Sequence, residues 1–217
     1  RYFDLYPLSE IEPPRLNSSS ELSNHPVLKA MRDYLNYDDF FDTESRQVAK
    51  ASYLGLCSFL DSHVGALIEA LHDSGQYEDT LIIYTSDHGE MAGNHGMWTK
   101  CVMYEESAGI PLILSGPGVS KGEVISTQAS LVDIHPTILQ ATGLGLSSND
   151  LDLPGYSLLD LVAGESPDRL VLSEYHDGGS ITGMFMIRKN QYKYVYYPGY
   201  RPQLFNLEKD PYESTDL

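Results

Sequence analysis

Positive charge is scarce in this sequence. Only 14 of its 217 residues are lysine or arginine, against 31 aspartates and glutamates, which gives a formal net charge of −17. Nucleic acids and anionic membranes attract basic surfaces, so neither is expected as a partner. If the ligand is an anion, local positive groups and a metal ion must attract it, because the overall field repels it.

Cysteines and long apolar runs are also scarce. Cys57 lies in a helical pattern and Cys101 in a glycine-rich region, so we expect two small buried hydrophobic residues and no disulfide framework. No run of 18 or more apolar residues occurs, so no membrane-spanning segment is expected. No secretory signal is visible, but the chain starts at Arg1 without an initiator methionine. The location, cytoplasmic or periplasmic, therefore stays open.

One stretch of the chain is rich in side chains that can bind a metal ion or take part in catalysis. It is TLIIYTSDHGEMAGNHGMWTK, at residues 80–100. Its apolar, β-branched start predicts a strand buried on both faces, as in the parallel sheet of an α/β protein. In such sheets, ligands bind beyond the carboxyl ends of the strands. The strand ends at Asp87 and His88, an oxygen and a nitrogen donor of the kinds that divalent metals use. Taken alone, Asp-His-Gly could also be an Asx-turn with a surface histidine.

The glycine-rich loop after this strand carries two further candidates. His95 lies between two glycines, and Lys100 ends the stretch. Glycines let the backbone approach a ligand closely, so we expect both side chains near the same site.

Two helices are expected before this stretch, over residues 25–35 and 44–72. The longer one carries an apolar stripe at three- and four-residue steps, and this stripe predicts a buried face. Thr43 is the expected N-cap and Gly75 the expected stop. The stripe consists of Tyr53, Leu56, Leu60, Val64, Leu67, Ile68 and Leu71.

The rest of the chain changes character toward its end. We expect a strand over 110–114 and a helical segment over 129–142, with either a kink or a new start at Pro136. Asp133 is expected to serve in capping or packing. Antiparallel strands are expected over 169–175, 184–197 as a hairpin, and 203–207. These elements predict an α/β body at residues 1–150 and a small antiparallel β appendage at 151–217.

The pattern S-D-H-G-x-x-x-G-x-H-G-x-W-x-K, followed by YEES, IPLILSGPG and the ending QLFNLEKDPYE, resembles the second half of a type I sulfatase, in the alkaline phosphatase superfamily. The resemblance covers nearly the whole chain. It implies part of an alkaline-phosphatase-like α/β sandwich with a mostly parallel central sheet, plus a small C-terminal antiparallel β subdomain.

The resemblance also assigns roles to single residues. Asp87 and His88 match ligands of a divalent cation, usually Ca²⁺, with Mg²⁺ or Mn²⁺ as alternatives. Lys100 matches a lysine that contacts the sulfate and takes part in catalysis. His95 matches a loop histidine that either faces the substrate, in a catalytic role, or orders the loop. His176 lies where related enzymes place part of the substrate pocket, with a surface histidine as the alternative.

One departure from the family pattern is large. Sulfatases need a Cys-x-Pro-x-Arg or Ser-x-Pro-x-Arg signature, whose first residue becomes the nucleophile formylglycine, and this chain has none. The family's N-terminal aspartates and a further catalytic histidine are also absent, and two protein ligands are too few for Ca²⁺. We therefore expect formylglycine in a missing N-terminal half, and an inactive chain in isolation.

The expected function is that of a sulfuric ester hydrolase acting on a small sulfate ester. A phosphonate monoester or phosphodiester hydrolase of the same superfamily is one alternative, and a non-catalytic binding module is another. The ending and SEYHDGGSITGMFMIR resemble choline-sulfatase-like bacterial enzymes, which favours a small substrate and a bacterial source. The oligomeric state is open, with a homo-oligomer as one option.

Overall fold

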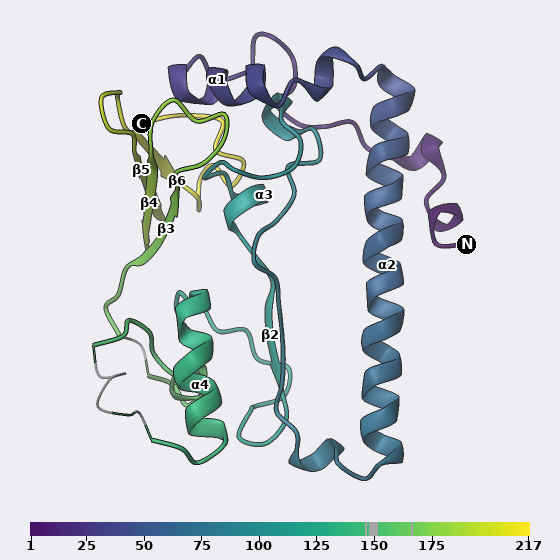
Figure 1. Cartoon of the computed structure of the whole chain (residues 1–217), viewed down its shortest axis with the longest axis vertical. Helices are drawn as coiled ribbons and strands as arrows, with labels where there is room; N and C mark the ends of the chain where they lie inside the picture. Colours follow the sequence, from purple (N-terminus) through teal and green to yellow (C-terminus); the bar gives the residue numbers. More distant parts are fainter. Residues whose placement is uncertain (146, 148–151, 166) are drawn as a thin grey trace.

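A computed structural model describes residues 1–145, 147, 152–165 and 167–217 of the chain. A long upright helix forms one side of the molecule, a pair of extended strands runs beside it, and a small sheet lies on the opposite side under a short helix (Figure 1). The expected boundary between residues 150 and 151 lies outside the described residues, so that division stays a prediction.

The two expected helices are present as α1, Pro26–Tyr34, and α2, Thr43–Asp73. The N-cap of α2 is Asp42, one residue before the expected Thr43: the Asp42 carboxylate accepts the Ser45 backbone N–H at 2.8 Å. An aspartate oxygen satisfies a free amide of the first turn and also favours the positive helix end. Gly75 follows α2 with a φ of +70°, a left-handed conformation that glycine adopts without strain.

The apolar stripe of α2 is not buried in this chain. Leu56 and Leu67 are 64% and 68% exposed, Cys57 is exposed as well, and only Ala51 and Gly55 of this helix are buried. The expectation of a buried Cys57 is therefore wrong. Gly55 is buried because the N-terminal segment crosses the helix there: an added Cβ would lie 3.1 Å from the backbone of Phe3.

By length and composition alone, α2 is also apolar enough to cross a membrane, with 6% of its most apolar window buried. Core helices of soluble proteins pass the same test, so this is weak support for a membrane span. The absence of a membrane partner stays a prediction.

The expected strands before and after the glycine-rich loop are β1, Ile82–Thr85, and β2, Leu112–Ser115. They pair with each other antiparallel, with Ile82 opposite Ser115 and Thr85 opposite Leu112. The parallel pairing expected for this part of the chain is thus not found between β1 and β2. Both are only half-buried or exposed, as at Ile113, which is 59% exposed.

Three shorter helices follow the loop: α3, Glu105–Ala108, α4, Ile134–Ala141, and α5, Leu158–Val162. Asp133 before α4 is fully buried and serves in both capping and packing, as expected. It forms a capping box with Ser130 and binds the Arg169 guanidinium through two hydrogen bonds of 2.9 Å. Short 3₁₀ helices lie at Phe3–Leu5, Leu8–Glu10, Tyr37–Asp39, Tyr77–Asp79, Asn94–Gly96 and Leu131–Asp133.

As expected, the C-terminal part forms an antiparallel sheet. Its four strands lie in the order β3-β4-β5-β6. The strands are β3, Val171–Tyr175, β4, Met184–Lys189, β5, Tyr192–Tyr196, and β6, Gln203–Asn206. The hairpin turns at Asn190, whose φ of +51° is tolerated by asparagine.

One hydrophobic core joins this sheet to α1 and to the glycine-rich loop. In Figure 1, α1 lies across the top of the sheet and of the loop. Six methionines take part, and such flexible side chains fill irregular gaps between elements of different kinds. The core residues are Val27, Leu28, Met31, Met91, Met97, Val102, Met103, Tyr104, Met184, Met186, Val195, Tyr197 and Phe205.

Candidate functional site

Asp87 and His88 lie directly after β1, as the sequence predicts. Oδ2 of Asp87 is 3.5 Å from Nε2 of His88, and both side chains are accessible, at 79% and 39% exposure. His88 Nδ1 lies 2.8 Å from the carbonyl oxygen of Gly89, which can only accept, so Nδ1 is the donor. In the neutral ring, Nε2 then carries the lone pair, and it faces the carboxylate.

This pair fits a metal ion in its donor chemistry. A hydrogen bond from the remote ring nitrogen is the usual way to orient a metal-binding histidine. The pKa of Asp87 is lowered: desolvation opposes the shift, but backbone hydrogen bonds, the electrostatic attraction of His88 and a hydrogen bond from Ser86 together outweigh it. The carboxylate is thus ionised at neutral pH. Among the described residues, no group of three or more His, Cys, Asp or Glu side chains could hold a metal ion.

Lys100 is exposed at the end of the glycine-rich loop, and neither a hydrogen bond nor an ion pair engages it within the described part of the chain. The backbone on either side of it is unusual. Thr99 and Cys101 have φ values of +69° and +80°, in the left-handed region that non-glycine residues rarely adopt. Such outliers concentrate at functional sites, where the surrounding structure holds them in place.

The loop itself is closed by backbone hydrogen bonds. Met91 N–H donates to the Thr99 carbonyl at 2.7 Å, and Gly93 N–H donates to the Met97 carbonyl at 2.8 Å. Gly89 approaches α3 so closely that an added Cβ would lie 2.1 Å from the Glu106 carbonyl oxygen. Gly89 therefore serves close backbone packing beside the site.

His95 is placed differently from the other candidates. Its ring is 3% exposed and stacks on Tyr104 with ring centroids 3.7 Å apart, while Nε2 lies 4.0 Å from Oε2 of Glu106. Burial lowers the pKa of His95 to about 4, although a hydrogen bond to the Tyr212 backbone opposes this shift. This geometry supports the loop-ordering alternative over a substrate-facing role.

His176 follows β3 and is exposed, with Nε2 3.5 Å from Oε2 of Glu174 and its ring packed edge-on against Phe185. Its neighbour Tyr175 packs against the core, as does Cys101, the residue after Lys100. The pKa of Tyr175 is raised by desolvation and by a hydrogen bond with the Cys101 thiol. The end of β3 therefore lies beside the loop that carries Lys100.

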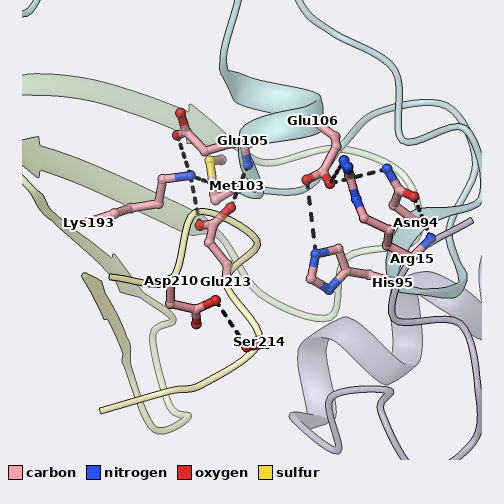
Figure 2. Close-up of polar contacts among 10 residues, drawn as sticks. All are labelled: Arg15, Asn94, His95, Met103, Glu105, Glu106, Lys193, Asp210, Glu213 and Ser214. Carbon is pink, nitrogen blue, oxygen red and sulfur yellow. Dashed lines mark hydrogen bonds and ion pairs between the residues drawn. The ribbon is translucent and has the colours of Figure 1, made fainter. Parts of the chain in front are cut away.

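A buried ionic cluster links the start of α3 to the C-terminal sheet and tail (Figure 2). Nζ of Lys193, fully buried on β5, lies 2.7 Å from Glu105 Oε1 and 2.8 Å from Glu213 Oε1, and it donates to the Met103 carbonyl at 2.8 Å. Burial raises the pKa of Glu213 to about 7, against the attraction of Lys193. The sequence offered little signal here: Lys193 alternates with apolar residues in a strand pattern, and Glu213 stands in the short DP-x-E ending.

A second set of contacts in Figure 2 holds the loop to the N-terminal segment. The Arg15 backbone N–H donates to Asn94 Oδ1 at 2.8 Å, and His95 N–H donates to the Arg15 carbonyl at 3.1 Å. Asn94 Nδ2 in turn donates to Glu106 Oε1 at 3.2 Å. The loop is thus tied to segments on both sides of it in sequence.

A cavity of about 600 Å³ lies elsewhere, between β2, the segment 119–129 and α5. Its lining is mostly apolar and includes neither Asp87 nor Lys100. We therefore place the candidate site at the end of β1 on the chemistry of its residues.

Two family models match the chain. The model described as "Sulfatase" matches residues 9–144, and the model described as "N-sulphoglucosamine sulphohydrolase, C-terminal" matches residues 93–217. Arylsulfatase K of Homo sapiens is 36% identical over 219 residues, which cover 95% of this chain and 40% of the human protein. The mouse protein is 37% identical over 190 residues, covering 82% of this chain and 34% of that protein.

Solved structures of related enzymes also resemble this chain. The phosphonate monoester hydrolase of Silicibacter pomeroyi superposes with a TM-score of 0.84 at 29% identity, covering 99% of this chain and 47% of that one. A protein solved in complex with its substrate, D-glucosamine-2-N,6-O-disulfate, gives a TM-score of 0.70 at 26% identity, covering 83% of this chain and 39% of that one. The chain thus spans less than half the length of each of these relatives. It belongs to the sulfatase family, with the family's α/β fold.

Proposed function

We propose that the protein containing this chain hydrolyses a sulfate ester, with Asp87 and His88 holding a divalent cation and Lys100 contacting the sulfate group. The observation that carries this proposal is the geometry at the end of β1. An ionised, exposed carboxylate faces an oriented imidazole, in a chain that belongs to the sulfatase family.

Charge explains why these residue types serve together. The sulfate group is an anion, and the chain has a net charge of −17, so the site must supply local positive charge. When bound, a divalent cation offsets negative charge on the substrate as a Lewis acid. Lys100 adds an ammonium group, which no acidic side chain among the described residues neutralises.

Ca²⁺ is the cation we favour, with Mg²⁺ or Mn²⁺ as alternatives. Ca²⁺ takes six to eight oxygen ligands, and Asp87 supplies a hard carboxylate. One aspartate and one histidine do not complete such a shell, so the remaining ligands come from sequence outside these 217 residues. No Cys-x-Pro-x-Arg or Ser-x-Pro-x-Arg occurs here, so we place the formylglycine outside this chain too.

The substrate that we propose is a small sulfate ester. One related structure holds a sulfated glucosamine, which shows that a sulfated sugar fits that relative's pocket. In this chain, exposed His176 at the end of β3, beside the Lys100 loop, is the residue we assign to contact the part of the substrate that carries the sulfate.

The assignment of Lys100 and Asp87 is tested in the complete gene product with a chromogenic aryl sulfate. We expect Lys100→Ala to lower kcat/KM by roughly 100-fold or more, the usual cost of removing a group that stabilises transition-state charge. Asp87→Asn should lower the bound metal, measured by elemental analysis, along with the activity. Lys121→Ala, in an exposed loop, is the matched control. Unchanged turnover in Lys100→Ala or Asp87→Asn would contradict the roles assigned here.

A phosphonate monoester hydrolase is the second candidate, favoured by the TM-score of 0.84 with such an enzyme. Tetrahedral anions of both kinds need a cation and a lysine, so the residues of this chain fit either substrate. The ratio of kcat/KM for an aryl sulfate to that for an aryl phosphonate decides between them. A ratio below one would favour the phosphonate reaction.

A further inference from the structure

The backbone around Lys100 adopts a conformation that its residues do not favour by themselves. Thr99 is β-branched, and at a φ of +69° its side chain crowds the backbone. Cys101 at +80° and Ala92 at +48° are in the same region. Since none of these residues is glycine, contacts elsewhere must hold the loop in this shape.

Glu90 supplies such contacts. Its Oε1 accepts the backbone N–H of Thr99 at 2.6 Å and that of Ala92 at 3.0 Å. Both donors belong to residues with positive φ, one at each end of the loop. Hydrogen bonds from amides to an ionised oxygen are shorter and stronger than those between neutral groups. A single carboxylate oxygen therefore closes the loop immediately before Lys100.

Thr99 is held at both of its backbone groups. Its N–H goes to Glu90, and its carbonyl accepts the Met91 N–H at 2.7 Å. Next to it, Trp98 is buried and packs edge-on against Phe41, with ring centroids 5.0 Å apart. Lys100 itself is exposed. Its stem thus begins at a fixed point, although its ammonium group is free to meet a ligand.

From this geometry we infer that Glu90 is a positioning residue for Lys100: its carboxylate holds Thr99 in the left-handed conformation that fixes where the lysine begins relative to Asp87 and His88. The inference rests on the proposed function, because it assumes that Lys100 contacts the reacting group. It assigns no proton transfer and no metal contact to Glu90.

Two conservative substitutions distinguish the contribution of the length of the Glu90 side chain from that of its charge. In Glu90→Gln the side-chain carbonyl oxygen keeps its length and can still accept both N–H groups, although the charge is lost. In Glu90→Asp the charge stays, but the shorter side chain cannot reach Thr99. We expect Gln to retain the wild-type loop and Asp to behave like Ala.

The first test measures the loop directly by amide hydrogen exchange in the complete gene product. Glu90→Ala and Glu90→Asp should raise the exchange rate of peptides containing Thr99, while Glu90→Gln and the exposed-loop control Glu123→Ala leave it near wild type. Unchanged exchange in both Glu90→Ala and Glu90→Asp overturns the inference. Because it does not use activity, this test does not depend on the proposed reaction.

The second test is a double-mutant cycle with Lys100→Ala on an aryl sulfate. We expect Glu90→Ala or Glu90→Asp to lower kcat by roughly 10- to 100-fold, as loss of alignment does, and Glu90→Gln to stay within about threefold of wild type. In the Lys100→Ala background, the same substitutions should change kcat by less than about threefold. An equal loss in both backgrounds overturns the inference, since Glu90 would then act independently of Lys100.

The results distinguish a failure of the positioning role of Glu90 from a failure of the proposed function. If Lys100→Ala is inactive and Glu90→Ala and Glu90→Asp are fully active, the inference is overturned and the proposed function stands. If Lys100→Ala is fully active, the proposed role of Lys100 fails, and the positioning role falls with it.

Discussion

Two histidines of the same motif show how environment decides what a residue can do. His88 is partly exposed, and its ring is oriented by the Gly89 carbonyl so that Nε2 faces Asp87. His95, seven residues later, is buried against Tyr104 and tied to the Tyr212 backbone. The first is accessible to a ligand, and the second is packed inside the protein, which favours the loop-ordering alternative.

The buried state of His95 predicts a loss of stability in acid. Its pKa is about 4 in the folded protein, against an ordinary value of 6.5, because burial penalises the charged ring. The unfolded chain therefore binds the proton first as the pH falls. The contribution of His95 is fully present above pH 6.5 and is lost as the pH falls toward 4, up to about 3 kcal/mol.

His95→Asn tests this, because asparagine tolerates the left-handed φ of +55° at this position but does not titrate. Denaturant unfolding at a series of pH values should show a smaller fall in stability between pH 6.5 and 4 than in the wild type. The difference between the two proteins at pH 8 reports the loss of packing on Tyr104 and of the hydrogen bond to the Tyr212 backbone, without a contribution from titration. Parallel pH curves for the two proteins would show that His95 is not the titrating group.

At the scale of elements, α2 shows that a helix can be predicted while its surroundings are not. The 3.6-residue periodicity predicts its length closely, but the cap is Asp42 and the apolar stripe is exposed. The cap depends on one local hydrogen bond, that of Ser45 N–H to the Asp42 carboxylate. The stripe needs contact with other segments to be buried, whereas the N-terminal segment crosses the helix at Gly55, outside the stripe.

The position of the cap predicts different effects for two adjacent residues. Asp42→Ala should lower the melting temperature by a few degrees, because an amide of the first turn loses its acceptor. Thr43→Ala, one residue on, should leave it nearly unchanged, since Thr43 is already helical. Thermal unfolding followed by circular dichroism measures both. A larger effect at Thr43 than at Asp42 would place the cap where the sequence pattern suggested.

For the whole molecule, the decisive feature is that the candidate site and the C-terminal sheet share one core. Loop residues such as Met91 and Met97 pack with Met184 on β4 and Val27 on α1. The ionic cluster around Lys193 adds a polar link from β5 to α3 and the tail. A substitution that destabilises the sheet should therefore also destabilise the loop that carries Lys100.

Lys193→Met tests the strength of this link. Removing the buried ammonium leaves the carboxylates of Glu105 and Glu213 without their shared partner, and such losses cost about 3–5 kcal/mol. Lys189→Met, on β4, is the matched control: its ion pair with Asp168 is partly exposed, so its removal should cost less than about 1 kcal/mol. Denaturant unfolding compares the two, and equal losses would contradict a special role for Lys193.

The sequence by itself determined which residues are candidates for the site, and it determined most of the elements. The Asp-His pair after a strand, the loop ending in Lys100, the two helices and the antiparallel end of the chain all follow from short-range spacing and periodicity. The spacing of the motif was also enough to place the chain in its family, as the family models confirm. These features are local, so neighbouring residues carry the signal.

Only the tertiary structure decided which of these residues are buried and what each one touches. It placed His95 inside, paired β1 with β2 antiparallel, left the stripe of α2 exposed, and brought Lys193 against Glu213. It also joined Glu90 to Thr99 across the loop. Burial and pairing depend on segments far apart in sequence, whose contacts no local pattern records, and the environment they create sets what each side chain can do.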